Sequence, residues 1–512
     1  MTETVMKQEE LWGHPKGLYV CFFTEMWERF SFYGMKALLV LYLVKYHLFA
    51  DSNANLLMGA YAGLAYSLPF IGGMISDRYL GMRKSVMFGG IMLVIGHFLM
   101  AFEGEQASMI NDVITRDDSA LAIFYLALSF IIIGVGFLKP NISTIVGKLY
   151  KDDDSRRDSG FTIFYMGINL GAFSATILCG WLGETYGWSY GFGLAGIGML
   201  AGLISFARGQ RHLMGHAEPH DPENLAKKVL GPITKEWLIY IISFASLAVV
   251  WFMVQKEHVV HLTANVLLVV AIAGILFYAF TKVDKVARDR LIVLMVLITS
   301  TIVFWSLFEQ ASTSMTLFAD RVIDREIFGF TVLASQFQSL NALFIIIFAP
   351  FFAWLWMRLD KFNMNPNIPL KFTFALFFVA AGFGVMIIGS NMASSTGHVA
   401  AIWLVLMYFL HTTGELCLSP VGLSAVTKLS PKNIVGFSMG TWFLATGLSE
   451  LLAAKIANIA AVDSATAQTM SVTDFLEKYT ELFWFMLELG MGAALIMLII
   501  SFPLKKLMHG IK

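Results

Sequence analysis

Residues 120–143 read ALAIFYLALSFIIIGVGFLKPNIS and carry no charge before Lys139. A helix that crosses the hydrocarbon core of a bilayer needs about 20 apolar residues, so this stretch is long enough to span a membrane. The whole chain of 512 residues has the same character, with 57% hydrophobic residues, 14% charged residues and a mean hydropathy of +0.68. Ordinary soluble domains are about 25% charged. The composition therefore predicts an all-α membrane protein.

Working outward from this stretch, the sequence predicts fourteen transmembrane helices in the order six, two, six. The first six are expected at about 17–48, 53–76, 85–103, 120–149, 161–183 and 188–207. Two more are expected at 236–254 and 262–281, and the last six at 290–319, 331–357, 372–391, 399–427, 433–460 and 480–504. Two groups of six predict the pseudo-repeats of the major facilitator fold, joined by an inserted helix pair.

The domains expected from this layout are a cytoplasmic tail, a six-helix bundle, a polar linker, the helix pair and a second six-helix bundle with its tail. Their bounds are 1–16, 17–207, 208–235, 236–281 and 282–512. The first 16 residues lack an apolar stretch followed by a cleavage site, so we expect a tail and not a signal peptide.

The positions of Lys and Arg predict that both termini are cytoplasmic, because cytoplasmic loops hold most of the basic residues in membrane proteins. With that orientation the outer segments contain only Lys45, Arg116, Lys256, Arg321, Arg325 and Lys478. The total of 36 Lys and Arg equals that of Asp and Glu, so no overall basic field favours nucleic acid as a partner. The three cysteines each lie in a hydrophobic run, and no metal-ligand spacing is present, so neither a disulfide framework nor a metal or cofactor is expected.

Charged side chains within the predicted spans mark a functional site, because such charges are costly in lipid and usually face a cavity in pairs. Glu25, Arg29, Tyr33 and Lys36 lie at offsets that place them on one face of the first helix, and Glu28 lies beside that face. The bland alternative is a Glu25–Arg29 pair that only neutralises a polar helix. A stripe that also holds a phenol and an ammonium favours function.

The fourth helix of each half pairs an ionisable residue with a proline, Lys139 with Pro140 and Glu415 with Pro420, and we expect proline to interrupt both helices. Glu309 lies on the first helix of the second half. We expect the cations of the first half to face these acids across a wet chamber, which suits a ligand with a negative and a positive end. Walls of the chamber are expected to include Tyr66, Trp305 and Trp442.

Three motifs resemble those of the proton-coupled oligopeptide transporters of the major facilitator superfamily. They are ExxERF with Phe32, Tyr33 and Gly34, the run FYMGINLGAF at 164–173, and GELCLSP at 414–420. A fourth motif, GGMISDRYLGMRKS at 72–85, resembles the general facilitator loop. The resemblance covers nearly the whole chain and includes the two extra helices of many bacterial members.

The resemblance implies proton-driven symport of di- and tripeptides by alternating access, with the proton as coupling ion and no cofactor. It implies a proton-coupling set of Glu25, Glu28, Arg29, Lys139 and Glu309. Lys36 and Lys139 would hold the peptide carboxylate, and Glu415 with Asn341 would hold the ammonium. The remaining residues implied at the substrate are Tyr33, Tyr66, Asn169, Trp305, Ser419 and Trp442.

Two alternatives to peptide symport stay open. One is transport of another small solute, nitrate or a drug, by a related facilitator. The other is an intramembrane enzyme or a sensor, for which the sequence offers no motif.

This chain departs from the family pattern at Lys36, where many members of the family have Arg. Lysine lacks the planar guanidinium with which Arg binds a carboxylate through two parallel hydrogen bonds. Animal members of the family that this sequence resembles carry an extracellular domain where this chain has only the short loop at 391–398, so the resemblance favours a bacterial inner-membrane protein. It lies in lipid, a monomer suffices for transport, and the sequence leaves the oligomeric state open.

Overall fold

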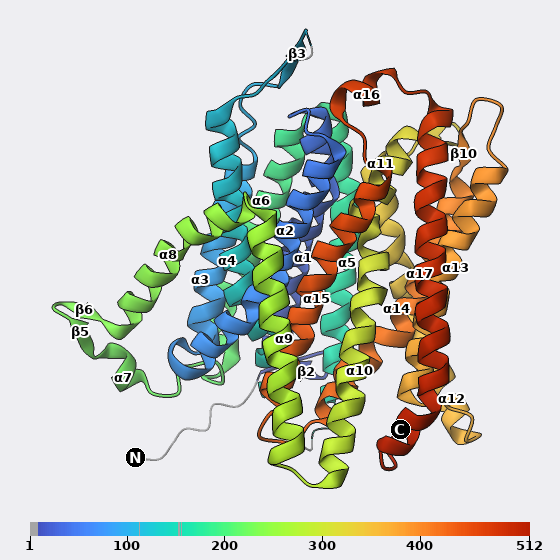
Figure 1. Ribbon diagram of the computed structural model, residues 1–512. Coiled ribbons are helices and arrows are strands. Elements are labelled where there is room, and N and C mark those ends of the chain that lie inside the picture. The colour runs from blue at the N-terminus through green and yellow to red at the C-terminus, as the bar shows by residue number, and fades with distance from the viewer. Residues whose placement is uncertain (1–8, 112, 152–153, 155, 512) are drawn as a thin grey trace. The chain divides into compact units, whose positions relative to one another are not determined.

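The computed structural model describes residues 9–111, 113–151, 154 and 156–511, and long helices make up most of it (Figure 1). In the first half of the chain the helices are α1 (Lys16–Lys45), α2 (Asp51–Ile75), η1 (Ser76–Leu80), α3 (Met82–Met100), α4 (Asp118–Lys148), α5 (Arg157–Tyr186), α6 (Trp188–Gly209) and η2 (Gln210–Leu213). The short α7 (Pro222–Ala226) precedes the inserted pair, α8 (Lys235–Val254) and α9 (Glu257–Thr281).

The second half has the long helices α10 (Lys285–Phe308), α12 (Ser339–Lys361), α13 (Ile368–Asn391), α14 (Ala401–Leu429), α15 (Val435–Ala457) and α17 (Val472–Leu507). Shorter helical pieces are η3 (Glu309–Ser312), α11 (Ser314–Arg321), η4 (Ala334–Gln338), η5 (Asn458–Ala460) and α16 (Ser464–Thr469).

All strands are two or three residues long and form two-stranded pairs. The antiparallel pairs are β1 (Glu10–Leu11) with β2 (His14–Pro15), β5 (Lys228–Leu230) with β6 (Ile233–Thr234), and β8 (Glu326–Ile327) with β9 (Phe330–Thr331). β7 (Ile323–Asp324) pairs in parallel with β10 (Val399–Ala400), and β3 (Ser108–Ile110) pairs with β4 (Val113–Thr115). The β1–β2 pair precedes α1, the other strands lie between helices, and none of them adds a sheet layer to the fold.

Thirteen helical segments of the described residues are long and apolar enough to cross a membrane. The fourteenth expected span is α1, which has the length but carries Glu25, Glu28, Arg29 and Lys36 and so falls short in composition. All fourteen expected spans are therefore helices. The chain is an integral membrane protein whose first span is unusually polar.

Two expectations about helix continuity were wrong. α4 and α14 run through Pro140 and Pro420 without a break, because a proline removes one helical hydrogen bond but the flanking turns stay paired. The first helix of the second half, expected to be continuous over 290–319, instead changes to a 3₁₀ turn at Glu309 and resumes at Ser314. Thr313, between the two pieces, has φ −125° and ψ −100°, outside the helical region.

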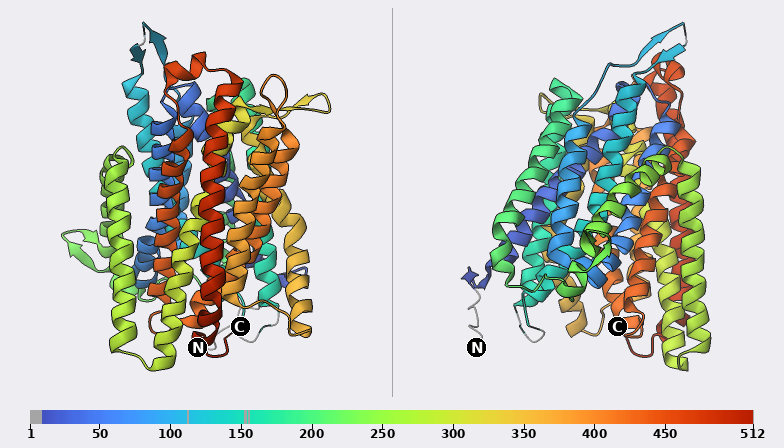
Figure 2. Two further views of the ribbon diagram at one scale, coloured as in Figure 1. Left: turned by 45° about the vertical axis from the view of Figure 1, so that its right-hand side comes forward. Right: turned by 90° about the vertical axis from the view of Figure 1, so that its left-hand side faces the viewer.

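The described chain divides into two compact units. Unit 1 contains the chain up to Leu38, Leu64–Met109 and Ile114–Lys256; unit 2 contains Leu39–Gly63, Ile110–Val113 and Glu257–Lys512. Within unit 1, α3 packs on α4 and α6, and glycines shorten the distance between backbones: a Cβ on Gly89 would lie 2.6 Å from the Gly134 oxygen. Within unit 2, α17 runs beside α13, red beside orange in Figure 2.

The two helices of the inserted pair belong to different units. α8 packs on α4 in unit 1, where the Trp251 indole donates a hydrogen bond to the Ala122 oxygen at 3.2 Å and Lys84 pairs with Glu236 at 2.6 Å. α9 packs on α10 and α15 in unit 2, where Asn433 donates to the Tyr278 hydroxyl at 2.6 Å.

Candidate functional site

The charged face of α1 forms a compact buried cluster in unit 1. Arg29 donates through Nε and Nη2 to the two carboxylate oxygens of Glu28, the second bond measuring 2.6 Å, and its Nε lies 3.3 Å from Glu25. All three residues are at most 4% exposed. The Arg29 guanidinium also lies 5.0 Å from the Phe32 ring centroid and 5.9 Å from that of Tyr33. One cation therefore neutralises part of two carboxylates, and the second Glu25 oxygen, Oε2, is buried with no hydrogen-bond partner.

Helix α5 packs directly on this cluster because of two glycines in the FYMGINLGAF run. A Cβ on Gly171 would lie 2.2 Å from the Met26 oxygen and 3.2 Å from the Arg29 Cβ, and one on Gly167 would lie 2.8 Å from the Phe22 ring. Any larger residue would push α5 away from α1. Asn169, between the two glycines, is buried, and its amide donates to the Tyr165 oxygen at 3.0 Å.

Lys139 lies near the same cluster, on α4. Among the described residues its ammonium makes no ion pair; it lies 4.0 Å from the centroid of the Tyr66 ring, while the charges of Arg29, Glu28, Glu25 and Lys36 act on it electrostatically. Lys36 itself is only 3% exposed. The charged residues of the first half thus act on one another around α1, and the two carboxylates act on Lys139 electrostatically without an ion pair among the described residues.

Helix α2 contacts α4 one turn before Lys139, at the carbonyl of Gly136. A proline cannot donate to the carbonyl four residues earlier, so the Gly136 oxygen loses its helical partner. A Cβ on Gly72 of α2 would lie 2.0 Å from that oxygen, so α2 and α4 are in backbone contact at this point. Gly72 therefore lets α2, which carries Tyr66, pack closely on α4, and Pro140 does not break α4.

The acids of the second half lie in unit 2. The Asn341 amide donates to Glu415 Oε2 at 2.8 Å and to the Thr412 hydroxyl at 3.1 Å, which holds the carboxylate on the half-buried face of α14. Glu309, at the break after α10, acts electrostatically on Glu415. These two carboxylates share one region, as the sequence predicted for this half.

The aromatic residues of unit 2 have different surroundings. Trp305 is partly exposed and packs edge-on against Phe308 with ring centroids 5.2 Å apart. Trp442 is 5% exposed, and a Cβ on Gly422 would lie 2.2 Å from its ring, so this indole packs tightly between α15 and α14. Ser419 is partly exposed one turn beyond Glu415. Lining of a substrate cavity by these side chains stays a prediction.

Comparison with known proteins identifies the family. The family model described as POT family matches residues 83–474. The chain belongs to the POT family. The peptide transporter YePEPT of Yersinia enterocolitica is 37% identical over 87% of this chain and 88% of its own length, and dipeptide and tripeptide permease A of Escherichia coli is 31% identical over 96% and 93%. An uncharacterized transporter of Bacillus subtilis, YclF, is 37% identical over 89% of this chain and 91% of its own.

Solved structures of POT transporters confirm the fold class. A mutant peptide transporter POT in complex with alafosfalin is 35% identical, covers 98% of both chains and superposes with a TM-score of 0.81. A POT family transporter in complex with 5-aminolevulinic acid is 29% identical, covers 97% of this chain and 98% of its own, and has a TM-score of 0.77. The expected resemblance, the helical transporter fold and the assignment as a transporter and not an enzyme are thereby confirmed.

Sequence reasoning missed one buried ion pair of this POT family member. Arg321 at the end of α11 donates through both terminal nitrogens to Asp51 at the start of α2, at 2.6 and 2.7 Å, and Asp51 also accepts from the Val462 amide at 3.1 Å. The side chains are 10% and 2% exposed. All of these residues belong to unit 2, which includes the adjoining ends of α1 and α2. The sequence shows that Asp51 and Arg321 lie near helix ends, but it does not show that they pair, because they are 270 residues apart.

Breaking this pair should destabilise the protein strongly. We expect Asp51→Asn or Arg321→Gln to lower the free energy of unfolding by about 3 kcal/mol, because the remaining buried charge loses its partner. The double variant should lose less than the sum of the two single losses. Thermal unfolding of the purified protein measures these differences. Removal of the partly exposed Lys45–Asp320 pair by Lys45→Gln is the control and should cost less than about 1 kcal/mol. An equal loss at both pairs would contradict the assignment.

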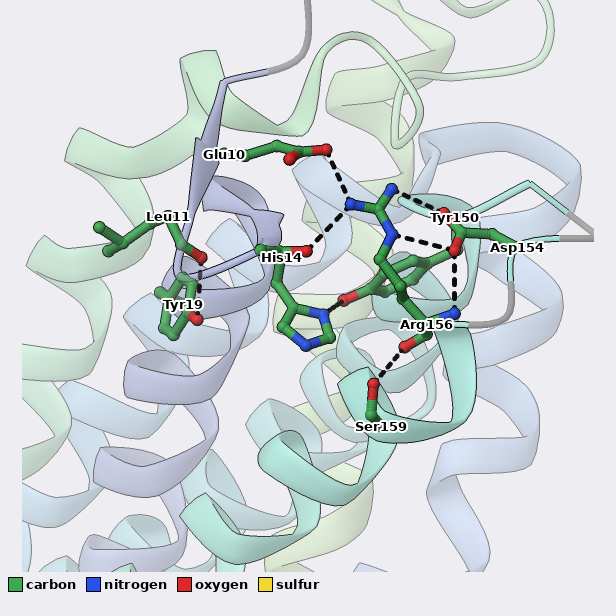
Figure 3. Close-up of polar contacts among 9 residues, drawn as sticks. Glu10, Leu11, His14, Tyr19, Tyr150, Asp154, Arg156 and Ser159 are labelled. Carbon is green, nitrogen blue, oxygen red and sulfur yellow. Dashed lines mark hydrogen bonds and ion pairs between the residues drawn. The ribbon is translucent and has the colours of Figure 1, made fainter.

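A second polar cluster outside the spans ties the start of the chain to the segment before α5 (Figure 3). Arg156 donates to Asp154 at 2.8 and 3.0 Å, to Glu10 of β1 at 2.8 Å and to the Gly13 oxygen at 2.9 Å. His14 of β2 lies 2.8 Å from the Tyr150 hydroxyl. The β1–β2 hairpin is thus fixed just before α1, which carries the charged cluster.

The contribution of this Arg156 cluster to the stability of the protein should not change across physiological pH. Hydrogen bonds from Arg156 lower the pKa of Asp154 to about 2. A carboxyl whose pKa is lowered on folding contributes stability above its unfolded value, about 3.9, and loses it as the pH falls toward the folded value. Arg156→Gln should therefore lower the unfolding temperature by the same amount at every pH between about 5 and 8. A thermal-shift series measures this, with exposed Lys151→Gln as control; a difference that varies within that range would show that another group titrates there.

Proposed function

We propose that this protein carries di- and tripeptides into the cell together with protons, by alternating access. That it is a peptide transporter follows from its place in the POT family, whose named relatives are peptide transporters. The observation that supports proton coupling is the buried cluster in which Arg29 pairs with both Glu28 and Glu25, and in which these charges also act on Lys139. Such a cluster can exchange a proton for a carboxylate.

The coupling works through the pairing of Arg29. When Glu28 or Glu25 is protonated, Arg29 and Lys139 lose a neighbouring negative charge, and a peptide carboxylate can take its place. The proton and the peptide then favour each other's binding by one reciprocal free energy. When the proton leaves toward the cytoplasm, the internal ion pair re-forms and the peptide carboxylate is released. In the proposal Glu309 takes part in the same proton-coupling set.

The peptide is held by its two ends and its backbone. Lys36 and Lys139 hold the carboxylate, and Glu415, oriented by Asn341, holds the terminal ammonium. The other substrate contacts in the proposal are Tyr33, Tyr66, Asn169, Trp305, Ser419 and Trp442. A zwitterion with both ends free satisfies this set. Nitrate would leave Glu415 without a cationic partner, which makes an inorganic anion the weaker candidate.

The proton gradient supplies enough energy for strong accumulation. Each proton that enters under a potential of 100 mV contributes about 2.3 kcal/mol, which supports a concentration ratio of roughly fifty for one proton per peptide. The protein lies, in this proposal, in the inner membrane of a bacterium with both termini in the cytoplasm, as the distribution of Lys and Arg indicates.

Uptake into sealed proteoliposomes tests the proposal. Labelled dialanine should accumulate only when the outside is acidic or the inside negative, and a protonophore should abolish accumulation. Unlabelled dialanine and trialanine should compete, whereas nitrate should not. Accumulation that ignores the gradient would reject proton coupling, and competition by nitrate equal to that of dialanine would reject the peptide as substrate.

A further inference from the structure

Lys371 on α13 is a buried cation that lies far in sequence from the cluster of Glu25, Glu28 and Arg29. It is 8% exposed, and its ammonium lies 4.4 Å from the centroid of the Trp356 ring on α12. Among the described residues this ammonium makes no hydrogen bond or ion pair. The ionisable side chains that act on it electrostatically are Cys417 and Lys428 of α14 and Asp360 of α12. The Lys371 ammonium therefore lies over the Trp356 ring and, among the described residues, has no anionic side chain in direct contact.

The position of Lys371 makes an anion more favourable still. It lies in the first turn of α13, where the helix dipole is positive and a cation is normally disfavoured. The Asn367 side chain already accepts from the Leu370 amide at 3.0 Å, and its carbonyl accepts from the Lys371 amide at 3.0 Å. The capping groups are thus satisfied by the chain itself, and the positive charge of Lys371 is not.

A second, independent donor lies beside the ammonium. The Trp356 indole Nε1 is buried and has no hydrogen-bond acceptor in the described structure. Indole nitrogen is a donor only, so an oxygen atom from outside the chain would satisfy it. A lysine ammonium and an indole N–H on neighbouring helices make a donor set for an oxyanion.

The surroundings are those of a membrane interface. Arg358 lies over the rings of Trp354 at 5.7 Å and Phe362 at 5.6 Å, and Phe362 and Met364 are 61% and 68% exposed. Basic and aromatic side chains gather at the headgroup level of membrane proteins. The Lys and Arg distribution places this end of α12 and α13 on the cytoplasmic side, where anionic lipids are abundant and basic pockets between helices bind their headgroups.

We propose that Lys371 and the Trp356 indole bind a phosphate group, supplied by an anionic lipid headgroup or by free phosphate. The ammonium pairs with one phosphate oxygen while the indole N–H donates to another. This site does not depend on the transported solute, because none of its residues belongs to the proposed substrate or proton-coupling set.

Binding to the delipidated full-length protein tests the proposal. The probes are dioctanoyl phosphatidylglycerol, dioctanoyl phosphatidylcholine and inorganic phosphate, followed by native mass spectrometry and thermal shift. Phosphatidylglycerol should bind most tightly, and Lys371→Gln should weaken it about tenfold, since a charge-assisted bond is lost. Trp356→Phe, which keeps the ring and removes only the N–H, should weaken it about fivefold.

Two controls keep the result decisive. Lys371→Arg retains the charge and should restore most of the binding, while Lys361→Gln, at an exposed lysine of the same end, should change it less than about twofold. Inorganic phosphate that binds as tightly as the lipid, and is lost with Lys371→Gln, would identify free phosphate as the source. Equal binding of phosphatidylglycerol by wild type, Lys371→Gln and Trp356→Phe would overturn the site, as would no binding of any probe to wild type.

Discussion

Replacing Glu28 by glutamine should abolish gradient-driven accumulation of peptide while exchange of peptide across the membrane continues. Glu28 is fully buried and accepts both donated bonds of Arg29. Glutamine has nearly the same shape but is neutral at every pH, so Arg29 would stay as it is in the protonated state. The peptide carboxylate could still bind, but its binding would no longer depend on a proton.

The expected size of the effect follows from the energy of the gradient. Wild type should reach an accumulation ratio of roughly fifty at 100 mV for one proton per peptide, and Glu28→Gln should reach about one. Counterflow of labelled dialanine against unlabelled dialanine, measured without a gradient, reports exchange alone. The two assays on the same proteoliposomes separate loss of coupling from loss of folding.

Two matched variants sharpen the Glu28 experiment. Glu25→Gln removes the more distant carboxylate of the cluster, and Lys139→Ala removes the cation beside Tyr66; both should also abolish accumulation. Ser31→Ala, one turn further on the same helix and also buried, should leave accumulation intact. Full accumulation by all three charge variants would reject the coupling role of the cluster.

The features that could be read from the sequence are those set by helical periodicity. The offsets of Glu25, Arg29, Tyr33 and Lys36 predict one face, and the structure places the carboxylates and guanidinium in one cluster there. The FYMGINLGAF motif at 164–173 also indicated α5, and the structure shows the reason: Gly171 allows the Met26 backbone and Arg29 to contact that helix.

The features that could not be read depend on tertiary contacts. The Asp51–Arg321 pair joins residues 270 apart, and no local pattern distinguishes Arg321 from other basic residues at helix ends. The break at Glu309 follows no proline or glycine, so composition gave no sign of it. Conversely, Pro140 predicted a break that the structure lacks, because the proline removes only one helical hydrogen bond and the flanking turns stay paired.

Replacing Glu415 should change the substrate preference, and by a large factor. If its carboxylate holds the peptide ammonium, Glu415→Ala should raise the KM for dialanine about ten- to a hundredfold, since a charge-assisted bond contributes about 1.5–3 kcal/mol. N-acetyl-dialanine has no ammonium, so its weaker transport should change little. Competition of both peptides with labelled substrate measures the two effects in one preparation.

A series at this position separates charge from hydrogen bonding. Glu415→Gln keeps an oxygen that can accept from Asn341, now at 2.8 Å, but removes the charge, so it should resemble Glu415→Ala for dialanine. Asn341→Ala leaves the charge of Glu415 in place and removes only the hydrogen bond that orients it. The KM for dialanine should therefore rise less, by about fivefold. Because the acetylated peptide carries the same carboxylate as dialanine, a general loss of the fold would weaken both peptides alike. Equal losses for the free and acetylated peptides in a Glu415→Gln protein that unfolds at the wild-type temperature would therefore remove Glu415 from the ammonium site.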